Sequence, residues 1–224
     1  MFDRVVRRPR MRSLARVPAV VLPVMILIAA SGCGSGGVGD ELNGMTRTPP
    51  TEVGRVALPD ESPGGGGRQT RLRGEEDGLM LVYFGYTFCP DVCPTTLADL
   101  GVALGELPEE QARRVKVGMV TVDPERDTPK ALNGYLGHFF APGRFASFRT
   151  TDDDELARAE SAFGASSKLG KADRHGNYEV AHTAQVFAVD GTGQVLVEWP
   201  FGTPSEDIRS DLERLLGDGG IGSA

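Results

Sequence analysis

Two stretches of the chain, residues 79–84 and 115–122, are continuously hydrophobic and have the length of β-strands. Unbroken hydrophobicity is typical of strands that are covered on both faces. Between them, leucines recur at helical spacing from Leu97 to Leu107, which predicts a helix that begins at Pro94. The strand–helix–strand order indicates an α/β layered domain.

The rest of the pattern extends this layered arrangement. Further strands are expected near 53–58, 145–149, 184–189 and 194–199, and further helices near 129–139, 152–163 and 205–216. Glycines 64–67 predict a loop or hairpin tip, and Asp190-Gly191-Thr192-Gly193 is a hairpin signal. The order predicts a thioredoxin-like fold, which is a mixed central sheet flanked by helices with a C-terminal β-hairpin and helix.

The first 33 residues have the pattern of an export signal. Six arginines precede a 14-residue apolar run at 17–30, which is short for a membrane-spanning helix and suits the core of a signal peptide. The run ends in Ala30-Ser31-Gly32-Cys33, with small residues before a cysteine as in bacterial lipoprotein cleavage sites. We expect residues 1–32 to be removed and Cys33 to carry lipid, with an uncleaved anchor as the alternative. Both place the body on the extracytoplasmic face of a bacterial cell membrane.

Composition divides the remaining chain into three parts. Residues 33–51 are rich in Gly, Ser, Thr and Pro and are expected to form a flexible tether, residues 52–217 the folded domain, and residues 218–224 a disordered tail. The formal net charge is -7, and without the N-terminal 31 residues 18 basic and 30 acidic residues remain. A body this acidic is a poor candidate for nucleic-acid binding.

Two cysteines, Cys89 and Cys93, lie between the first buried strand and its helix. With Pro94 as the first helical residue, Cys93 would be at or near the N-cap. A helix N-terminus lowers a thiol pKa and favours the thiolate, which binds metals and attacks disulfides. A plain stabilising disulfide is disfavoured, because its loop would be short.

His182 is the histidine that the predicted fold places against these cysteines. His138 lies off the apolar stripe of its helix, and His175 belongs to a polar stretch, 168–177, that is expected to be a loop. His182 begins the hairpin strand, whose start faces the cysteine loop in a thioredoxin-like sheet. Two thiolates and one imidazole suit Cu(I) and tolerate Cu(II), whereas zinc in structural sites usually takes four ligands. We therefore expect Cys89, Cys93 and His182 to bind one copper ion.

Three aspartates are candidates for supporting these ligands. Asp123 and Asp127 follow the second buried strand at the same sheet edge, and Asp91 lies between the cysteines. They could orient a metal ligand, or they could serve in turns and helix caps. Both interpretations remain open.

Three motifs, FGYTFCPDVCPTTL, TVDPERDTPKAL and AHTAQVFAVDGTGQV, resemble in order and spacing the Sco/SenC family of copper proteins, over roughly residues 79–217. The resemblance implies a membrane-tethered, thioredoxin-like domain that binds one copper through Cys89, Cys93 and His182. It also implies delivery of copper to the Cu-A site of cytochrome c oxidase, or reduction of the thiols of that site. The partner would be the oxidase subunit that carries Cu-A, or another exported copper protein.

Two functions remain in competition, with a copper metallochaperone favoured over an enzyme. The alternative is a thiol–disulfide oxidoreductase with Cys89 or Cys93 as the attacking thiolate. Thioredoxin-type reductases carry a cis-proline next to the dithiol, but here no proline occurs between Pro142 and Pro200. A peroxiredoxin-like peroxidase is a weaker third possibility, since its threonine and arginine partners are not recognisable.

Overall fold

The structure is a computed structural model that describes residues 41–217. The predicted signal peptide, Cys33 and the C-terminal tail lie outside this range. The strands are β1 (Thr51–Glu52), β2 (Ala57–Asp60), β3 (Arg68–Arg71), β4 (Leu79–Gly85), β5 (Val115–Thr121), β6 (Phe145–Phe148), β7 (Ser167–Leu169), β8 (Val180–His182), β9 (Gln185–Val189) and β10 (Gln194–Pro200). The helices are α1 (Val92–Glu106), α2 (Glu109–Arg113), α3 (Pro129–Leu136), α4 (Asp153–Phe163) and α5 (Ser205–Leu216). None of these helices combines the length and hydropathy that crossing a bilayer requires.

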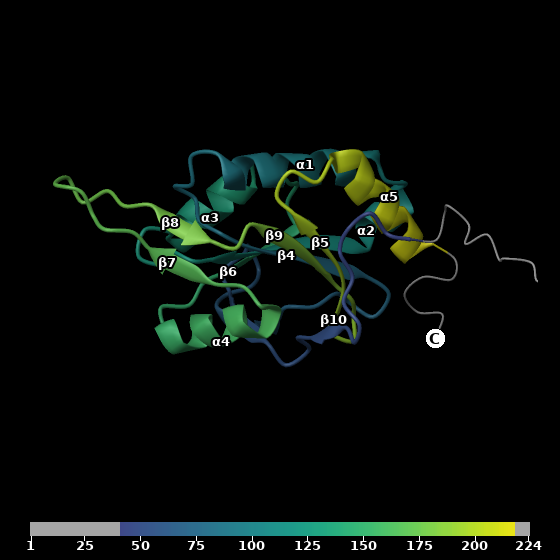
Figure 1. The fold of residues 1–224 in the computed structure, drawn as a ribbon, viewed down its shortest axis with the longest axis horizontal. Helices are drawn as coiled ribbons and strands as arrows, with labels where there is room; N and C mark the ends of the chain where they lie inside the picture. Colours follow the sequence, from purple (N-terminus) through teal and green to yellow (C-terminus); the bar gives the residue numbers. More distant parts are fainter. Residues whose placement is uncertain (1–40, 218–224) are drawn as a thin grey trace, which may run out of the picture. The chain divides into compact units, whose positions relative to one another are not determined.

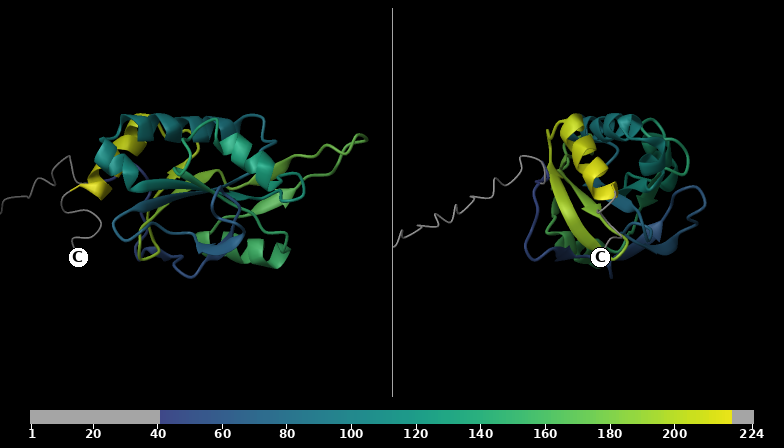
Figure 2. Two further views of the ribbon diagram at one scale, coloured as in Figure 1. Left: turned by 180° about the vertical axis from the view of Figure 1, so that it is seen from behind. Right: turned by 90° about the vertical axis from the view of Figure 1, so that its right-hand side faces the viewer.

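Eight strands form the central sheet, in the order β1-β10-β9-β4-β5-β6-β2-β3. Strand β5 is parallel to β4 and β6, whereas β9 is antiparallel to both β4 and β10. Helices α1, α3 and α5 cover one face of this sheet, and α4 lies on the other (Figure 1 and Figure 2). All of β4 is buried between these layers, as its unbroken hydrophobicity predicts. The mixed sheet, the β9–β10 hairpin and the closing helix α5 are those expected from the sequence.

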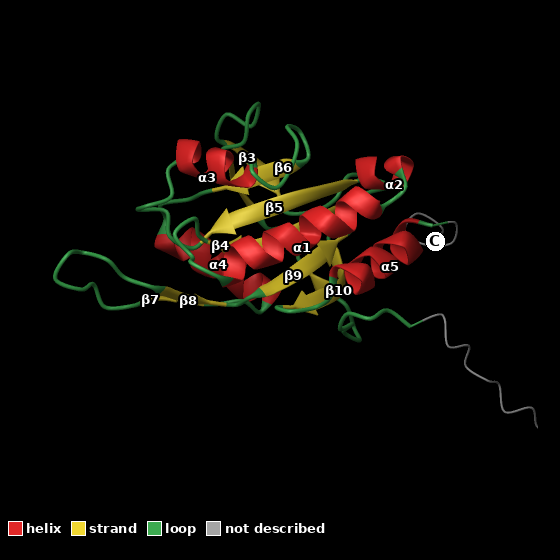
Figure 3. Cartoon of the chain, turned by 90° about the horizontal axis from the view of Figure 1, so that it is seen from above, coloured by secondary structure: helices red, strands yellow, loops and turns green. Residues whose placement is uncertain are grey.

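Strands β7 and β8 form a separate two-stranded sheet. Their register pairs Ser167 with His182 and Leu169 with Val180. The connection at 170–179 extends away from the central sheet (Figure 3). We call residues 167–182 the histidine hairpin. The predicted loop at 168–177 is therefore loop for most of its length, but its first two residues belong to β7.

Two predicted boundaries near the start of the domain are wrong. Of the strand expected at 53–58, only residues 57 and 58 are strand, as the start of β2, and β1 ends before residue 53. The N–H of Val56 donates to the carbonyl of Val53 at 2.8 Å and turns the chain between the two strands. The tether expected over 33–51 does not extend to residue 51. The backbone N–H groups of Asn43 and Gly44 donate to the carboxylate of Asp211 at 2.7 and 2.9 Å. A buried carboxylate of α5 thus holds a segment whose composition alone indicates flexibility.

Candidate metal centre

Cys89 lies in the connection between the carboxyl end of β4 and helix α1, residues 86–91, which we call the cysteine loop, and Cys93 lies just after it. Helix α1 begins at Val92 with Asp91 in the N-cap position, two residues earlier than predicted, so Cys93 is inside the first turn. Pro94 is compatible with this turn, because first-turn N–H groups have no acceptor within the helix. Leu97 and Leu100 are fully buried and fix the helix against the sheet. The positions of both cysteines are therefore set by core elements.

The structure brings Cys89, Cys93 and His182 together. Their ligand atoms all lie within 4.8 Å of one another, and no other such group of three metal-binding side chains is found in residues 41–217. The Sγ of Cys93 lies 3.5 Å from Nε2 of His182, and the N–H of Cys93 donates to Sγ of Cys89 at 3.3 Å. Both cysteines are free thiols. His138 and His175 are exposed elsewhere, as expected from the sequence.

The imidazole of His182 is oriented for metal binding. Its Nδ1 lies 3.1 Å from the carbonyl oxygen of Thr183, an arrangement in which Nδ1 carries the proton and Nε2 presents a lone pair towards Cys93. The rings of Tyr83 and Tyr86 meet the imidazole edge to face, with centroid distances of 6.1 and 5.7 Å. Burial lowers the pKa of His182, which favours the neutral form that binds metals.

The environment of Cys93 differs from the one predicted. Burial raises the pKa of its thiol to about 12, whereas the helix N-terminus was expected to lower the pKa. The side chain is 0% exposed, so the cost of removing a thiolate from water exceeds the stabilisation by the helix dipole. A metal that binds here must therefore displace the proton of Cys93.

A cavity of about 500 Å³ opens between the cysteine loop and the histidine hairpin. Its lining includes Cys89, Pro90, Leu169 and His182, but not Cys93. Two of the three candidate ligands thus face the open side, and the third lies below them in the core. This arrangement allows a bound ion to exchange from one side.

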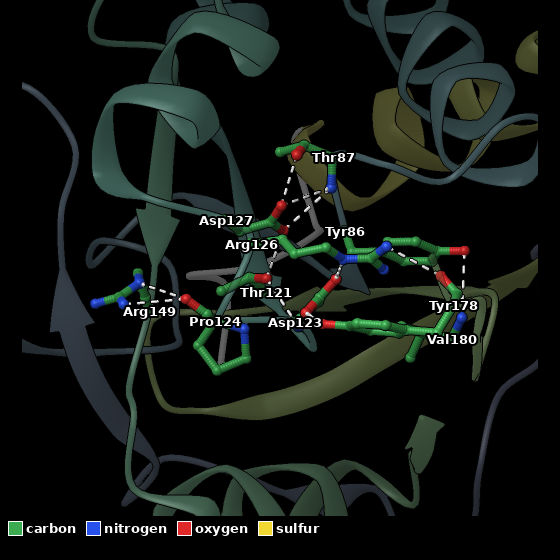
Figure 4. Close-up of polar contacts among 10 residues, drawn as sticks. All are labelled: Tyr86, Thr87, Thr121, Asp123, Pro124, Arg126, Asp127, Arg149, Tyr178 and Val180. Carbon is green, nitrogen blue, oxygen red and sulfur yellow. Dashed lines mark hydrogen bonds and ion pairs between the residues drawn. The ribbon is translucent and has the colours of Figure 1, made fainter. Parts of the chain in front are cut away.

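Asp127 supports the cysteine loop through hydrogen bonds and does not contact the ligand atoms. Its carboxylate accepts hydrogen bonds from the hydroxyls of Thr87 and Thr121 at 2.5 and 2.6 Å (Figure 4). The backbone N–H of Thr87 donates to the same carboxylate at 3.1 Å. Asp91 is exposed and makes no capping hydrogen bond. The hydrogen bonds of Asp127 support a role in orienting the cysteine loop, whereas Asp91 makes no contact within residues 41–217 that would give it such a role.

Asp123 supports the histidine hairpin instead. It forms an ion pair with Arg126 and accepts a hydrogen bond from the hydroxyl of Tyr178 at 2.8 Å. Sequence reasoning missed both partners. Arg126 could have been noticed, because it lies in the same quoted motif as Asp123. Nothing in the sequence indicated a role for Tyr178, because it lies 52 residues from Arg126 along the chain.

The fold and this site define a class of protein, a thioredoxin-like domain with a soft Cys–Cys–His ligand set at the carboxyl edge of its parallel strands. The sequence model of one family, described as SCO1/SenC, matches residues 65–217. The chain belongs to this family, as the three motifs predicted.

Solved structures of relatives confirm the fold. Apo Sco1 of Thermus thermophilus is 32% identical with a TM-score of 0.67, and the match covers 81% of this chain and 100% of that one. Copper-bound ScoI of Bradyrhizobium japonicum is 29% identical with a TM-score of 0.58, covering 71% and 96% of the two chains. Copper, the cofactor expected from the sequence, is thus present in one of these relatives.

A protein of Stutzerimonas stutzeri whose name describes copper binding is 33% identical over 115 residues, which are 51% of this chain and 54% of that protein. SCO2-like proteins of Rickettsia felis and Rickettsia conorii are matched over 64% and 56% of their lengths. The chain therefore spans between half and two thirds of the length of these curated relatives.

Proposed function

We propose that this protein is a copper carrier that binds one copper ion through Cys89, Cys93 and His182. The observation that carries the proposal is the placement of two thiols and one imidazole within 4.8 Å of one another. This soft, three-coordinate donor set suits Cu(I) and tolerates Cu(II). Membership of the SCO1/SenC family and a copper-bound relative at 29% identity support the choice of metal.

The arrangement of the ligands suits loading and release. Cys93 lies in the core, whereas Cys89 and His182 line the open cavity. A partner's ligands can therefore approach from the side of Cys89 and His182 and replace them before Cys93. An acceptor with thiolate and imidazole ligands matches this chemistry. We infer that the acceptor is the Cu-A subunit of cytochrome c oxidase, or another exported copper protein.

We further propose that the protein is a lipoprotein. Residues 1–32 would be its signal peptide, Cys33 its lipid-bearing residue, and the polar segment before Asn43 its tether. Residues 52–217 would be the copper-binding domain on the extracytoplasmic face of the membrane, followed by a disordered tail at 218–224. This part of the proposal rests on the apolar run and the small residues before Cys33.

A second function, thiol–disulfide exchange, is favoured by the proximity of the two thiols. Cys89 and Cys93 have sulfur atoms within 4.8 Å, so a small movement would allow a disulfide. Forming that bond releases two protons and two electrons, which would reduce a disulfide of the partner protein. The same sulfur atoms cannot hold copper while they are joined, so the two activities exclude each other at any moment.

The copper site is tested by titrating the full-length protein with Cu(I) in the presence of a competing chelator. His182→Ala should weaken binding strongly, whereas His138→Ala and His175→Ala should bind like the wild type, because those histidines are exposed elsewhere. Equal losses in all three variants would overturn the assignment of His182.

Alkylation on the same samples separates the two functions. Cu(I) should protect both thiols from alkylation, and oxidation should abolish Cu(I) binding until a reductant is added. His182→Ala should lose metal but still form the disulfide, while Cys89→Ala and Cys93→Ala lose both properties. Stoichiometric Cu(I) on fully disulfide-bonded protein would show that these cysteines are not the site.

Lipidation is tested by intact mass spectrometry of protein expressed in a bacterium. The wild type should carry acyl chains on Cys33, and Cys33→Ser should remain unprocessed or be released from the membrane. An unmodified Cys33 in membrane-bound wild-type protein would contradict lipidation and favour an uncleaved anchor.

A further inference from the structure

His182 is supported differently from the two cysteines. Cys89 lies between β4 and α1 and Cys93 lies in the first turn of α1, whereas His182 ends β8, which pairs with β7 outside the central sheet. After His182, Thr183 and Ala184 lead directly into β9 of the central sheet, whereas the other end of β8 depends on how the histidine hairpin is attached to the rest of the domain. Polar contacts at Tyr178, just before β8, attach this end of the hairpin.

Three side chains, Asp123, Arg126 and Tyr178, form a closed set of contacts just before β8 (Figure 4). The guanidinium of Arg126 stacks on the ring of Tyr178, with Cζ 3.7 Å from the ring centroid. Its Nη1 donates to the carbonyl of Tyr178 at 3.0 Å, and its Nε is ion-paired with Asp123. The hydroxyl of Tyr178 closes the set by donating to Asp123 at 2.8 Å. We call these three residues the clasp.

The clasp lies between the cysteine loop and strand β8. On the loop side, Cζ of Arg126 is 5.0 Å from the ring centroid of Phe88 and 5.7 Å from that of Tyr86. On the hairpin side, the N–H of Val180, the first residue of β8, donates to the hydroxyl of Tyr86 at 3.4 Å. One guanidinium thus contacts the residue that precedes Cys89 and the segment that leads to His182.

The clasp is largely shielded from solvent, which strengthens its contacts. The side chains of Asp123 and Arg126 are 1% and 21% exposed. Ion pairs and cation–π contacts are stronger when water is partly excluded. Because a guanidinium is planar and carries several N–H donors, it can stack on a ring and bond to a carboxylate and a carbonyl at the same time.

We propose that Arg126 is a positioning residue of the metal centre, which holds the histidine hairpin so that Nε2 of His182 stays beside Sγ of Cys93. The inference rests on the proposed function, since it takes His182 to be a ligand. Groups that orient metal ligands typically contribute 10- to 100-fold in metal affinity. Arg126→Met should therefore weaken copper binding by about 10- to 100-fold, although it removes no ligand.

Arg149 offers a matched control. It donates two hydrogen bonds to the carbonyl of Pro124, at 3.2 and 3.0 Å, in the same segment as the clasp. Within residues 41–217 it has no hydrogen bond, ion pair or cation–π contact with the histidine hairpin. Arg149→Met should thus bind copper like the wild type. Arg126→Lys keeps the charge but not the planar stacking, and should give an intermediate loss.

The experiment combines copper affinity with a measurement on metal-free protein. Affinities are measured by chelator competition for the wild type, Arg126→Met, His182→Ala and the double variant. If Arg126 acts through His182, the loss caused by Arg126→Met disappears in the His182→Ala background. In metal-free protein, amide exchange at Val180 should be faster in Arg126→Met and unchanged in Arg149→Met.

Each outcome has a distinct meaning. Wild-type copper affinity in His182→Ala contradicts the proposed function itself. A weakened His182→Ala with an unaffected Arg126→Met contradicts the positioning role alone. An equal loss from Arg126→Met with and without His182 also overturns it, because the loss would then come from general destabilisation. Should Arg126→Met fail to fold, the copper affinity of Arg126→Lys is measured instead, alone and combined with His182→Ala.

Discussion

The cysteine loop and the histidine hairpin contribute to one metal centre but differ in their support. The loop joins a strand with seven buried residues to a helix whose Leu97 and Leu100 are fully buried. The hairpin is a two-stranded sheet in which Leu169 is 54% exposed, attached just before β8 by the clasp. Local stability follows buried apolar contacts, so the loop should open only with global unfolding and the hairpin more easily. The comparison predicts that substitutions around the loop lower stability, whereas substitutions in the clasp change the placement of His182.

The largest effect is expected from the helix that fixes the loop. Leu100→Ala removes a fully buried side chain of α1 and should lower the free energy of unfolding by about 2–5 kcal/mol. Leu169→Ala, in the half-exposed hairpin strand, should change it by less than about 0.5 kcal/mol. Denaturant unfolding of both variants measures the difference. Similar losses would show that the hairpin is as much a part of the core as α1.

A smaller but more local effect is expected at Gly85, the last residue of β4. A Cβ there would lie 2.6 Å from Cε1 of Tyr83 and 3.1 Å from Sγ of Cys93. Gly85→Ala should therefore cost about 1–3 kcal/mol of stability through overpacking, and should also weaken copper binding by displacing Cys93.

Gly105→Ala is the control for that substitution. Gly105 lies in α1, where an added Cβ meets no atom within 4 Å, so alanine should be neutral or stabilising. Amide exchange in the histidine hairpin should be unchanged in both variants. If Gly85→Ala accelerated exchange there, the loop and the hairpin would not be separately supported.

The sequence predicted the well-packed half of the centre better than the other half. Continuous hydrophobicity and helical leucine spacing identify β4 and α1, and with them the position of Cys89 and Cys93. The pKa direction of Cys93 was wrong because it depends on burial, which is set by residues distant in the sequence. The role of Tyr178 was missed for the same reason, because it depends on contacts with Asp123 and Arg126, which are distant in the sequence.

Removing a contact between Asp127 and the cysteine loop should have an intermediate effect on the free energy of unfolding. Thr87→Val removes the hydroxyl that donates to Asp127 at 2.5 Å but keeps the backbone donor of residue 87. Because Asp127 is 0% exposed, loss of one partner should cost about 1–3 kcal/mol of unfolding free energy. Thr95→Val, at an exposed position of α1, is the control and should change stability by less than about 0.5 kcal/mol. An unchanged stability in Thr87→Val would show that the loop does not depend on Asp127.

The smallest effect is expected at the tip of the hairpin, where Asp173 organises a turn. The backbone N–H groups of Asn177 and His175 donate to its carboxylate at 2.9 and 2.7 Å and lower its pKa. Since the pKa is lower in the folded protein, this contribution is present above the ordinary aspartate pKa of about 3.9 and is lost as the pH falls through the lowered value.

Asp173→Ala should therefore speed amide exchange at residues 175 and 177 at neutral pH, measured by NMR, and the difference from the wild type should vanish in strong acid. The free energy of unfolding should stay at the wild-type value, because the tip is exposed. Copper affinity should stay at the wild-type level, since the clasp lies between this turn and His182 and isolates the ligand from motion of the tip. A loss of affinity as large as that expected for Arg126→Met would instead mean that the whole hairpin moves as one unit, and the clasp would no longer be the point that fixes His182.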